Sequence, residues 1–133
     1  MKGFSRDDTV KKIIIERPGG YDRLQIKEFP TPTPQNNEVL IKVSAAGVNF
    51  ADVFIRLGLY KSGKEFVGWP ITPGFEFSGK VVKCGPDVSH FAEGTPVFGI
   101  TRFGAYASHL CVPAPQVFIL PDDSKFSSDD WAA

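Results

Sequence analysis

Glycine and proline interrupt this sequence so often that little of it can form long helices. The chain has 13 glycines and 11 prolines among its 133 residues. Proline removes a backbone donor and clashes with the preceding turn of a helix, and glycine is entropically costly there. The segment Pro30-Thr31-Pro32-Thr33-Pro34 is the clearest case, because its alternate prolines favour an extended backbone. This punctuation predicts short strands joined by turns rather than a helical bundle.

Segments rich in apolar and β-branched residues lie between these turns. Several alternate between apolar and polar residues, which is typical of a half-buried strand. Gly79 falls inside one of them and predicts a bulge. The expected strands are residues 12–16, 24–29, 39–46, 75–84, 96–100, 105–112 and 116–120.

One segment changes to helical spacing. Residues 50–57 place apolar side chains on a common face, Asn49 precedes them as a suitable N-cap, and Gly58 follows as a suitable C-terminal residue. Asp52 and Arg56 are four positions apart, a spacing at which an ion pair can orient the helix. We therefore expect one or two short helices in a chain of about seven strands.

Composition excludes several classes of protein. Lysine plus arginine and aspartate plus glutamate each number 15, so the net charge of zero argues against a nucleic-acid-binding protein. Hydrophobic residues make up 42% of the chain and charged residues 23%, which favours a folded domain over a disordered one. No apolar stretch approaches the roughly 20 residues of a membrane helix, and residues 1–12 lack the apolar core of a signal peptide. With only Cys84 and Cys111, we expect a reduced, cytoplasmic protein.

The usual motifs of nucleotide, metal and hydrolase sites are missing. The chain has neither Gly-x-Gly-x-x-Gly nor a phosphate-binding loop, so it has no nucleotide fingerprint of its own. His109 and Cys111 could face one side of a strand, but a zinc site needs two further ligands. A Gly-x-Ser-x-Gly nucleophile elbow is also absent. We expect no metal site.

The helical segment and its surroundings carry a family resemblance. Ala45-Ala46-Gly47-Val48-Asn49-Phe50-Ala51-Asp52-Val53-Phe54-Ile55-Arg56-Leu57-Gly58-Leu59-Tyr60 resembles the catalytic domain of the medium-chain dehydrogenase/reductase superfamily. More narrowly, it is similar to the zinc-independent quinone oxidoreductase branch, which includes relatives of the vesicle amine transport protein. The order and spacing of further segments support the resemblance, namely residues 38–43, 72–79, 88–94, 103–107 and 119–122.

The resemblance implies a fold and a domain organisation. It predicts a mainly β domain with some α structure, a GroES-like, partly open β-barrel over residues 1–133. Family members continue into a Rossmann domain, which is absent from this chain. We therefore expect a catalytic domain truncated before that Rossmann domain and inactive by itself. Residues 127–133 resemble the first turn of a further helix.

The resemblance also assigns roles to five residues. Zinc-dependent members carry cysteine at position 49 and histidine at position 75, where this chain has Asn49 and Phe75, so it implies a metal-free site. Asn49 and Tyr60 are the expected catalytic and cofactor-binding residues, and Phe54 is expected to contact the cofactor. Phe54, Phe75 and Phe103 would form the wall of a substrate pocket. Each residue also has a purely structural reading, as an N-cap for Asn49 or as core packing for the aromatic residues.

The implied reaction is hydride transfer from NADPH to a quinone or an activated alkene such as an enone, without zinc. The cofactor carries the demanding chemistry, and the protein positions it. The resemblance also implies that the full-length protein could form a homodimer. Two other readings stay open, a non-catalytic GroES-like binding or oligomerisation module and a membrane-associated regulatory relative. No basic amphipathic segment supports the second of these.

Overall fold

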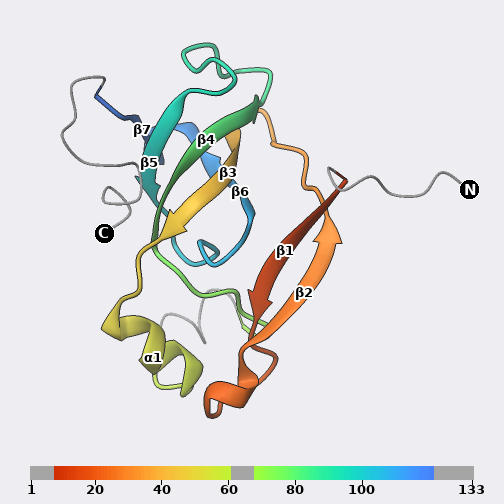
Figure 1. Ribbon diagram of the computed structural model, residues 1–133, viewed down its shortest axis with the longest axis vertical. Coiled ribbons are helices and arrows are strands. Elements are labelled where there is room, and N and C mark those ends of the chain that lie inside the picture. The colour runs from red at the N-terminus through yellow and green to blue at the C-terminus, as the bar shows by residue number, and fades with distance from the viewer. Residues whose placement is uncertain (1–7, 61–67, 122–133) are drawn as a thin grey trace, which may run out of the picture.

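The computed structural model describes residues 8–60 and 68–121 and is mostly β-structure (Figure 1). Its one α-helix among these residues is α1 (Phe50–Arg56), and two short 3-10 helices are η1 (Tyr21–Arg23) and η2 (Ala114–Gln116). The strands are β1 (Thr9–Ile14), β2 (Gln25–Pro30), β3 (Glu38–Ala46), β4 (Glu76–Cys84), β5 (Pro96–Ile100), β6 (His109–Pro113) and β7 (Val117–Ile119). This confirms the prediction of a mainly β domain with one or two short helices. The helical turn expected at residues 127–133 lies outside the described residues.

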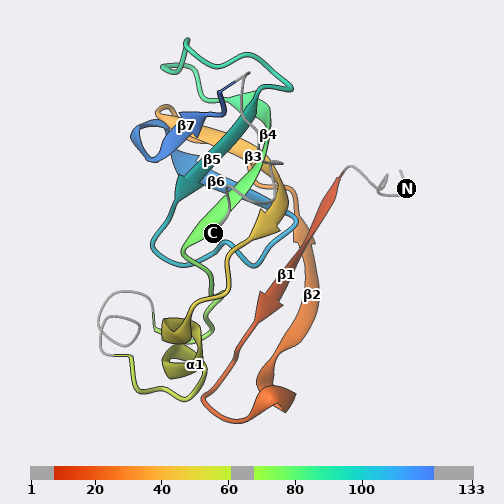
Figure 2. The same cartoon turned by 60° about the vertical axis from the view of Figure 1, so that its left-hand side comes forward.

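The strands form two antiparallel sheets. β1 pairs with β2, and the second sheet has the order β6-β3-β4-β5-β7. β6 and β7 lie at opposite edges of this sheet, yet only the three residues of η2 connect them. Three residues span at most about 10 Å, so the sheet must curl until its edges approach each other. The result is the partly open barrel that the resemblance implied, and Figure 2 shows the curled strands from the side.

The core fills the inside of this curled sheet. Along β3, Val39 and Ile41 are completely buried, whereas Lys42 is exposed. Leu40, between Val39 and Ile41, is also buried at 3% exposed, so this part of β3 is covered on both faces. The other buried members of the core are Phe77, Val81, Phe91, Val97, Ala105, Val112, Ala114 and Val117.

Gly79 lies at the expected irregularity, but the extra residue is on the neighbouring strand. Val43 pairs with Gly79 and Ala45 pairs with Ser78, so Ser44 has no partner of its own on β4. A Cβ atom at position 79 would overlap the carbonyl oxygen of Lys42. Glycine is needed here because the backbones of β3 and β4 approach each other closely.

The small β1–β2 sheet lies beside the barrel and joins it through a few backbone contacts (Figures 1 and 2). Ile13 N–H donates to the Tyr106 carbonyl at 2.9 Å, and Ile15 and Ile71 exchange hydrogen bonds of 2.8 and 2.9 Å. β1 begins at Thr9, earlier than the predicted residues 12–16, because Thr9 and Val10 pair with the end of β2.

The predicted strand over residues 105–112 was wrong in its first half. β6 begins at His109, and the preceding residues form only an isolated bridge between Ala107 and Lys12. The N–H groups of Ala105 and Tyr106 instead donate to the carbonyls of Gly74 and Pro73, at 3.3 and 3.0 Å. These loop contacts replace the regular ladder.

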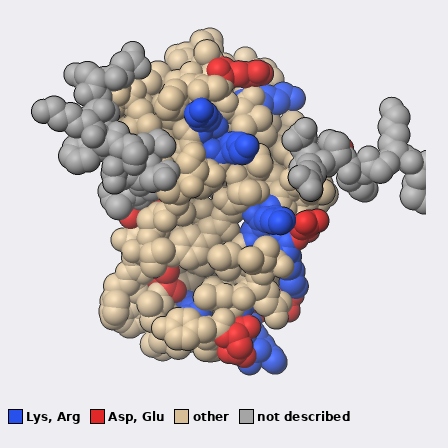
Figure 3. Space-filling model, viewed as in Figure 1, with Lys and Arg blue, Asp and Glu red and all other residues tan. Residues whose placement is uncertain are grey.

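Helix α1 buries two charged side chains together with Ile55, and it exposes other apolar side chains. Asp52, Ile55 and Arg56 are buried, whereas Phe50 is 76% exposed. An apolar helix stripe normally faces a core. We call these exposed side chains the exposed apolar face of α1, and its members are Val48, Phe50, Phe54, Leu57 and Leu59. Figure 3 shows that the surface over α1, at the lower left, is largely free of charged side chains. No helix among the described residues is long and apolar enough to cross a membrane.

Candidate functional site

Asn49 begins α1 and forms a capping box with Asp52. Its backbone is extended, with φ −115° and ψ 154°, and its N–H donates to Asp52 Oδ2 at 2.9 Å. The Asn49 side chain in turn faces the backbone N–H of Asp52. This arrangement satisfies donors that the first turn of a helix would otherwise leave free. The N-cap predicted from the sequence is confirmed.

Glu76 holds the other side of the Asn49 amide. Asn49 Nδ2 donates to Glu76 Oε1 at 3.0 Å, and the Gly47 N–H donates to the Glu76 carbonyl at 3.1 Å. Glu76 is the first residue of β4, so these two bonds tie the loop before α1 to the barrel sheet. The half-buried Asn49 side chain therefore has a defined orientation.

Three aromatic rings gather beside Glu76. The ring centroids of Phe75 and Phe103 are 5.3 Å apart, and Tyr60 lies 6.0 and 6.1 Å from them. They line a hollow of about 320 Å³ together with Ile100, Thr101, Arg102 and Gln116. This is the one place in residues 8–60 and 68–121 where the structure brings three of the five expected site residues into one cluster.

Phe54 does not join this cluster. Its ring packs edge-on against Phe50 with centroids 5.2 Å apart, and it is 39% exposed on the outer face of α1. The structure therefore brings together Phe75 and Phe103, two of the three residues expected in the substrate wall. Tyr60, expected to contact the cofactor, takes the third place.

Asp52 is the centre of a buried hydrogen-bond network that the sequence did not reveal. Besides the Asn49 N–H, its carboxylate accepts the Gly74 N–H at 3.2 Å and the Tyr106 hydroxyl at 2.9 Å. Burial raises the pKa of the Tyr106 phenol far above its ordinary value, and the hydrogen bond to Asp52 raises it further. Tyr106 thus stays protonated and donates. No local pattern could reveal this contact, because 54 positions separate the two residues.

The ion pair expected between Asp52 and Arg56 was wrong. Arg56 donates to the Gly19 carbonyl at 2.8 Å, and its guanidinium lies 4.3 Å from the ring centroid of Tyr21. The two charged side chains share a helix but contact different parts of the fold. Both are buried because distant backbone groups and rings satisfy them.

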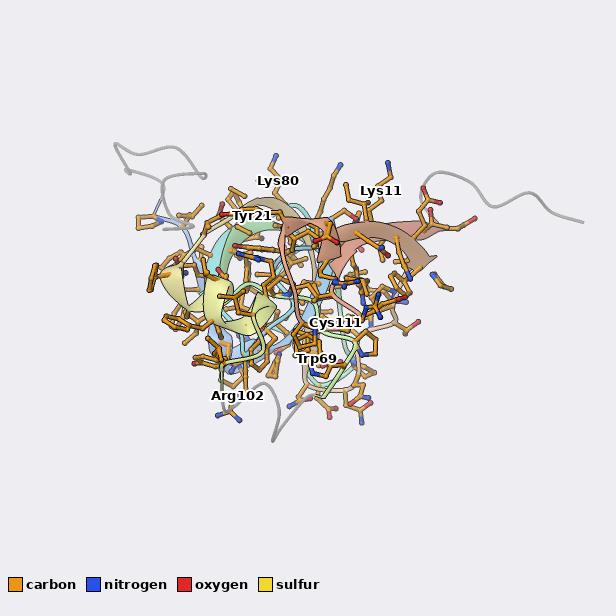
Figure 4. All side chains as sticks on the ribbon, turned by 90° about the horizontal axis from the view of Figure 1, so that it is seen from below. Lys11, Tyr21, Trp69, Lys80, Arg102 and Cys111 are labelled. Atoms are coloured by element: carbon orange, nitrogen blue, oxygen red, sulfur yellow. The ribbon has the colours of Figure 1, made fainter. Side chains whose placement is uncertain are left out.

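The described residues contain no cluster of metal ligands. No group of three or more histidine, cysteine, aspartate or glutamate side chains that could hold an ion occurs in residues 8–60 and 68–121. Of the two candidates named above, His109 has its Nδ1 3.0 Å from Ser108 Oγ. Cys111 is half-buried, whereas Lys11 and Lys80 project from the edge of the molecule in Figure 4.

Cys111 is expected to react slowly with alkylating reagents. Burial raises the pKa of its thiol from 9.0 to about 11, with the charge of Glu38 adding to this effect and that of Lys12 opposing it. At pH 8 the reactive thiolate should be about 100-fold scarcer than in an ordinary cysteine. In a Cys84→Ala variant, we expect iodoacetamide labelling about 100-fold slower than in the same chain unfolded in guanidinium. Labelling within a fewfold of the unfolded rate would contradict this expectation.

The geometry fits one end of a nicotinamide cofactor better than the whole molecule. Asn49 offers an oriented amide, and Tyr60, Phe75 and Phe103 offer flat apolar surface, which suits a ring and its ribose. Asn49 is not among the residues that line the hollow, so the structure does not bring it into the aromatic cluster. The sequence has no glycine-rich phosphate loop to hold the diphosphate.

Comparison with known proteins gives a consistent picture. Residues 35–122 match the family model described as the alcohol dehydrogenase GroES-like domain. The mouse synaptic vesicle membrane protein VAT-1 homolog-like is 32% identical over 118 residues, which cover 89% of this chain and 28% of that protein. The quinone oxidoreductase of Sus scrofa is 36% identical over 110 residues, covering 81% of this chain and 32% of that enzyme.

Solved structures agree. The Escherichia coli quinone oxidoreductase complexed with NADPH superimposes with a TM-score of 0.83 at 34% identity, over 92% of this chain and 36% of that one. The chain thus spans about 28–36% of the length of these similar proteins.

Proposed function

Because this chain belongs to the family of alcohol dehydrogenase GroES-like domains in the medium-chain dehydrogenase/reductase superfamily, we propose that it is the catalytic domain of a zinc-independent quinone oxidoreductase. In this proposal it directs hydride transfer from NADPH to a quinone or an enone. The domain extends over residues 1–133 and works with a Rossmann domain, since the similar proteins are about three times longer.

The observation that carries the proposal is the pairing of an oriented amide with an aromatic cluster. Asn49 is held by Glu76 at 3.0 Å, and Phe75, directly before Glu76, packs against Phe103 and Tyr60. A quinone is flat and apolar with carbonyl oxygens at its edge. The rings would bind its faces and exclude water, and the Asn49 amide would donate a hydrogen bond to one of its oxygens.

NADPH would supply the hydride when bound. In the proposal, Asn49 and Tyr60 contact its nicotinamide end, and Phe54 approaches from the outer side of α1. The relative solved with NADPH supports this choice of cofactor. Reduction of a quinone needs no Lewis acid, because its oxygens accept charge readily, and Asn49 and Phe75 stand where zinc-dependent members of the superfamily have metal ligands.

A domain exchange tests the proposal. Residues 8–121 would replace the matching part of the Escherichia coli quinone oxidoreductase, which covers 92% of this chain. We expect the chimera to oxidise NADPH when a quinone is added, whereas the isolated chain binds NADPH weakly and does not turn over. In the chimera, Asn49→Ala should lower kcat/KM about tenfold, the loss of one hydrogen bond in the transition state. Asn36→Ala, at an exposed turn, is the matched control and should leave the rate unchanged.

Three outcomes would count against the proposal. A chimera whose activity is abolished by EDTA and restored by zinc would contradict the metal-free site. A folded chimera that binds NADPH without reducing any quinone or enone would favour a non-catalytic binding module. Rapid NADPH oxidation by the isolated chain would contradict the need for a second domain.

A further inference from the structure

The Asn49 side-chain amide has one N–H group for which the described residues provide no acceptor. Its oxygen is turned toward the start of α1, where it faces the backbone N–H of Asp52 in the capping box. One Nδ2–H donates to Glu76 Oε1 at 3.0 Å. No acceptor among residues 8–60 and 68–121 takes the second Nδ2–H. A ligand at this position would therefore meet a hydrogen-bond donor.

The orientation of the amide follows from the chemistry on both of its sides. An ionised carboxylate only accepts hydrogen bonds, and the first turn of a helix presents only donors. Exchanging the oxygen and nitrogen of Asn49 would place oxygen against the Glu76 carboxylate and an NH₂ group against the Asp52 N–H. Both contacts would be repulsive, so Glu76 and the helix select the same orientation.

Glu76 and Asp52, the two residues that face the Asn49 amide, are themselves held in place. The Glu76 carbonyl accepts the Gly47 N–H, and Glu76 begins a strand inside the five-stranded sheet. Asp52 is held by Gly74 and Tyr106. A side chain whose own partners are fixed can hold another side chain in one rotamer.

We propose that Glu76 is a positioning residue, which turns the Asn49 amide so that its remaining N–H donates to an acceptor oxygen of the bound reactant. This inference rests on the proposed function, because it takes Asn49 as a contact of the ligand. The acceptor is a ribose or carboxamide oxygen of the nicotinamide end, or a carbonyl oxygen of the quinone. All of these oxygens accept a hydrogen bond, and separate titrations with NADPH and with a quinone distinguish between them.

The orientation is tested first without a ligand. In the ¹⁵N-labelled 133-residue chain, the two protons of the Asn49 side-chain amide should be separated by more than the ordinary difference between the two protons of an asparagine amide, and the proton bonded to Glu76 should exchange slowly with solvent. Glu76→Ala should remove this extra separation and speed the exchange. Glu76→Gln should keep most of the extra separation, since the glutamine oxygen can accept the same bond. Glu28→Ala, which removes an exposed carboxylate on β2, is the matched control.

The contact with the reactant is tested by two titrations of the same signals. One uses NADPH alone, and the other uses duroquinone, whose methylated ring cannot add a cysteine thiol. We expect at least one of them to shift the second Asn49 proton. For that ligand, Glu76→Ala should weaken binding about tenfold, while Glu76→Gln should stay within about threefold of the original chain. If Glu76 only stabilised the fold, Glu76→Gln would not selectively restore the binding affinity that Glu76→Ala loses.

The possible failures are distinct. If neither ligand shifts Asn49 although its amide signals show the extra separation, the proposed contact between Asn49 and the ligand is wrong and the orientation stands. If a ligand shifts Asn49 and Glu76→Ala binds it as tightly as the original chain, the positioning role is wrong. Should Glu76→Ala fail to fold, Glu76→Asp takes its place, because it keeps the charge and shortens the reach.

Discussion

Replacing Asp52 with asparagine should lower the free energy of unfolding by about 2–4 kcal/mol, although the two side chains have nearly the same shape. The Asp52 carboxylate accepts from Asn49 and Gly74 through their backbone N–H groups and from Tyr106 through its hydroxyl. An asparagine has one acceptor oxygen and must turn its NH₂ group toward one of these buried donors. Urea unfolding followed by circular dichroism measures the loss.

Tyr106→Phe separates the parts of this network. It removes a single donor and leaves the carboxylate with both backbone partners, so we expect a smaller loss of about 1–2 kcal/mol. The order of the two variants is the decisive result. If Asp52→Asn proved no more damaging than Tyr106→Phe, the carboxylate could not be the centre that joins α1 to the loops at Gly74 and Tyr106.

Gly79→Ala should be nearly as damaging, with a loss of about 2–4 kcal/mol in the free energy of unfolding. Its conformation is not the cause, because Gly79 is not among the glycines with positive φ. The added Cβ would overlap the carbonyl oxygen of Lys42 and crowd Ile41. A strand backbone cannot swing aside as the end of a flexible side chain can, so β3 and β4 would have to separate. The same unfolding measurement applies.

Ser78→Ala is the matched control at the adjacent position. Ser78 is completely buried, and its hydroxyl has no hydrogen-bond partner in the part of the chain that the structure describes. Removing an unsatisfied buried hydroxyl should change stability by less than about 1 kcal/mol, in the stabilising direction. Equal destabilisation by both variants would show that β4 tolerates no change, and would refute the steric explanation for Gly79.

The elements of this fold were largely predictable because their signals are local. Strand β5 was predicted with the observed bounds, and α1 was found from its cap at Asn49 and from Gly58, which has φ +75°. The error at residues 105–108 had a non-local cause. The Tyr106 N–H donates to the Pro73 carbonyl, and no sequence pattern within the segment indicates a partner so far away.

The direction in which α1 faces was also beyond the sequence. Helical spacing identifies the side chains that share a face, but it does not say whether that face meets the core. Asp52 and Arg56 are buried because Gly74, Tyr106 and Gly19 supply their partners, from segments far along the chain. The i,i+4 spacing instead suggested that they pair with each other. The long-range hydrogen bonds of Asp52 and Arg56 thus took precedence over the ion pair that their i,i+4 spacing predicts.

The candidate site was only partly predictable, because some of its contacts join residues far apart in the sequence. The grouping of Phe75 and Phe103 into one wall was anticipated through the family resemblance, and the structure adds Tyr60 to it. The link between Asn49 and Glu76 joins residues 27 positions apart, so no local pattern reveals it. The roles of these residues toward a ligand stay predictions.

The exposed apolar side chains on α1 and just after it distinguish selection for folding from selection for another function. Phe50 and Leu59 are 76% and 67% exposed, so this domain gains little by keeping them apolar. A mutational scan that scores cellular abundance should find serine harmless at both positions. Any intolerance that appears only when fitness is scored must then originate outside the domain's own folding.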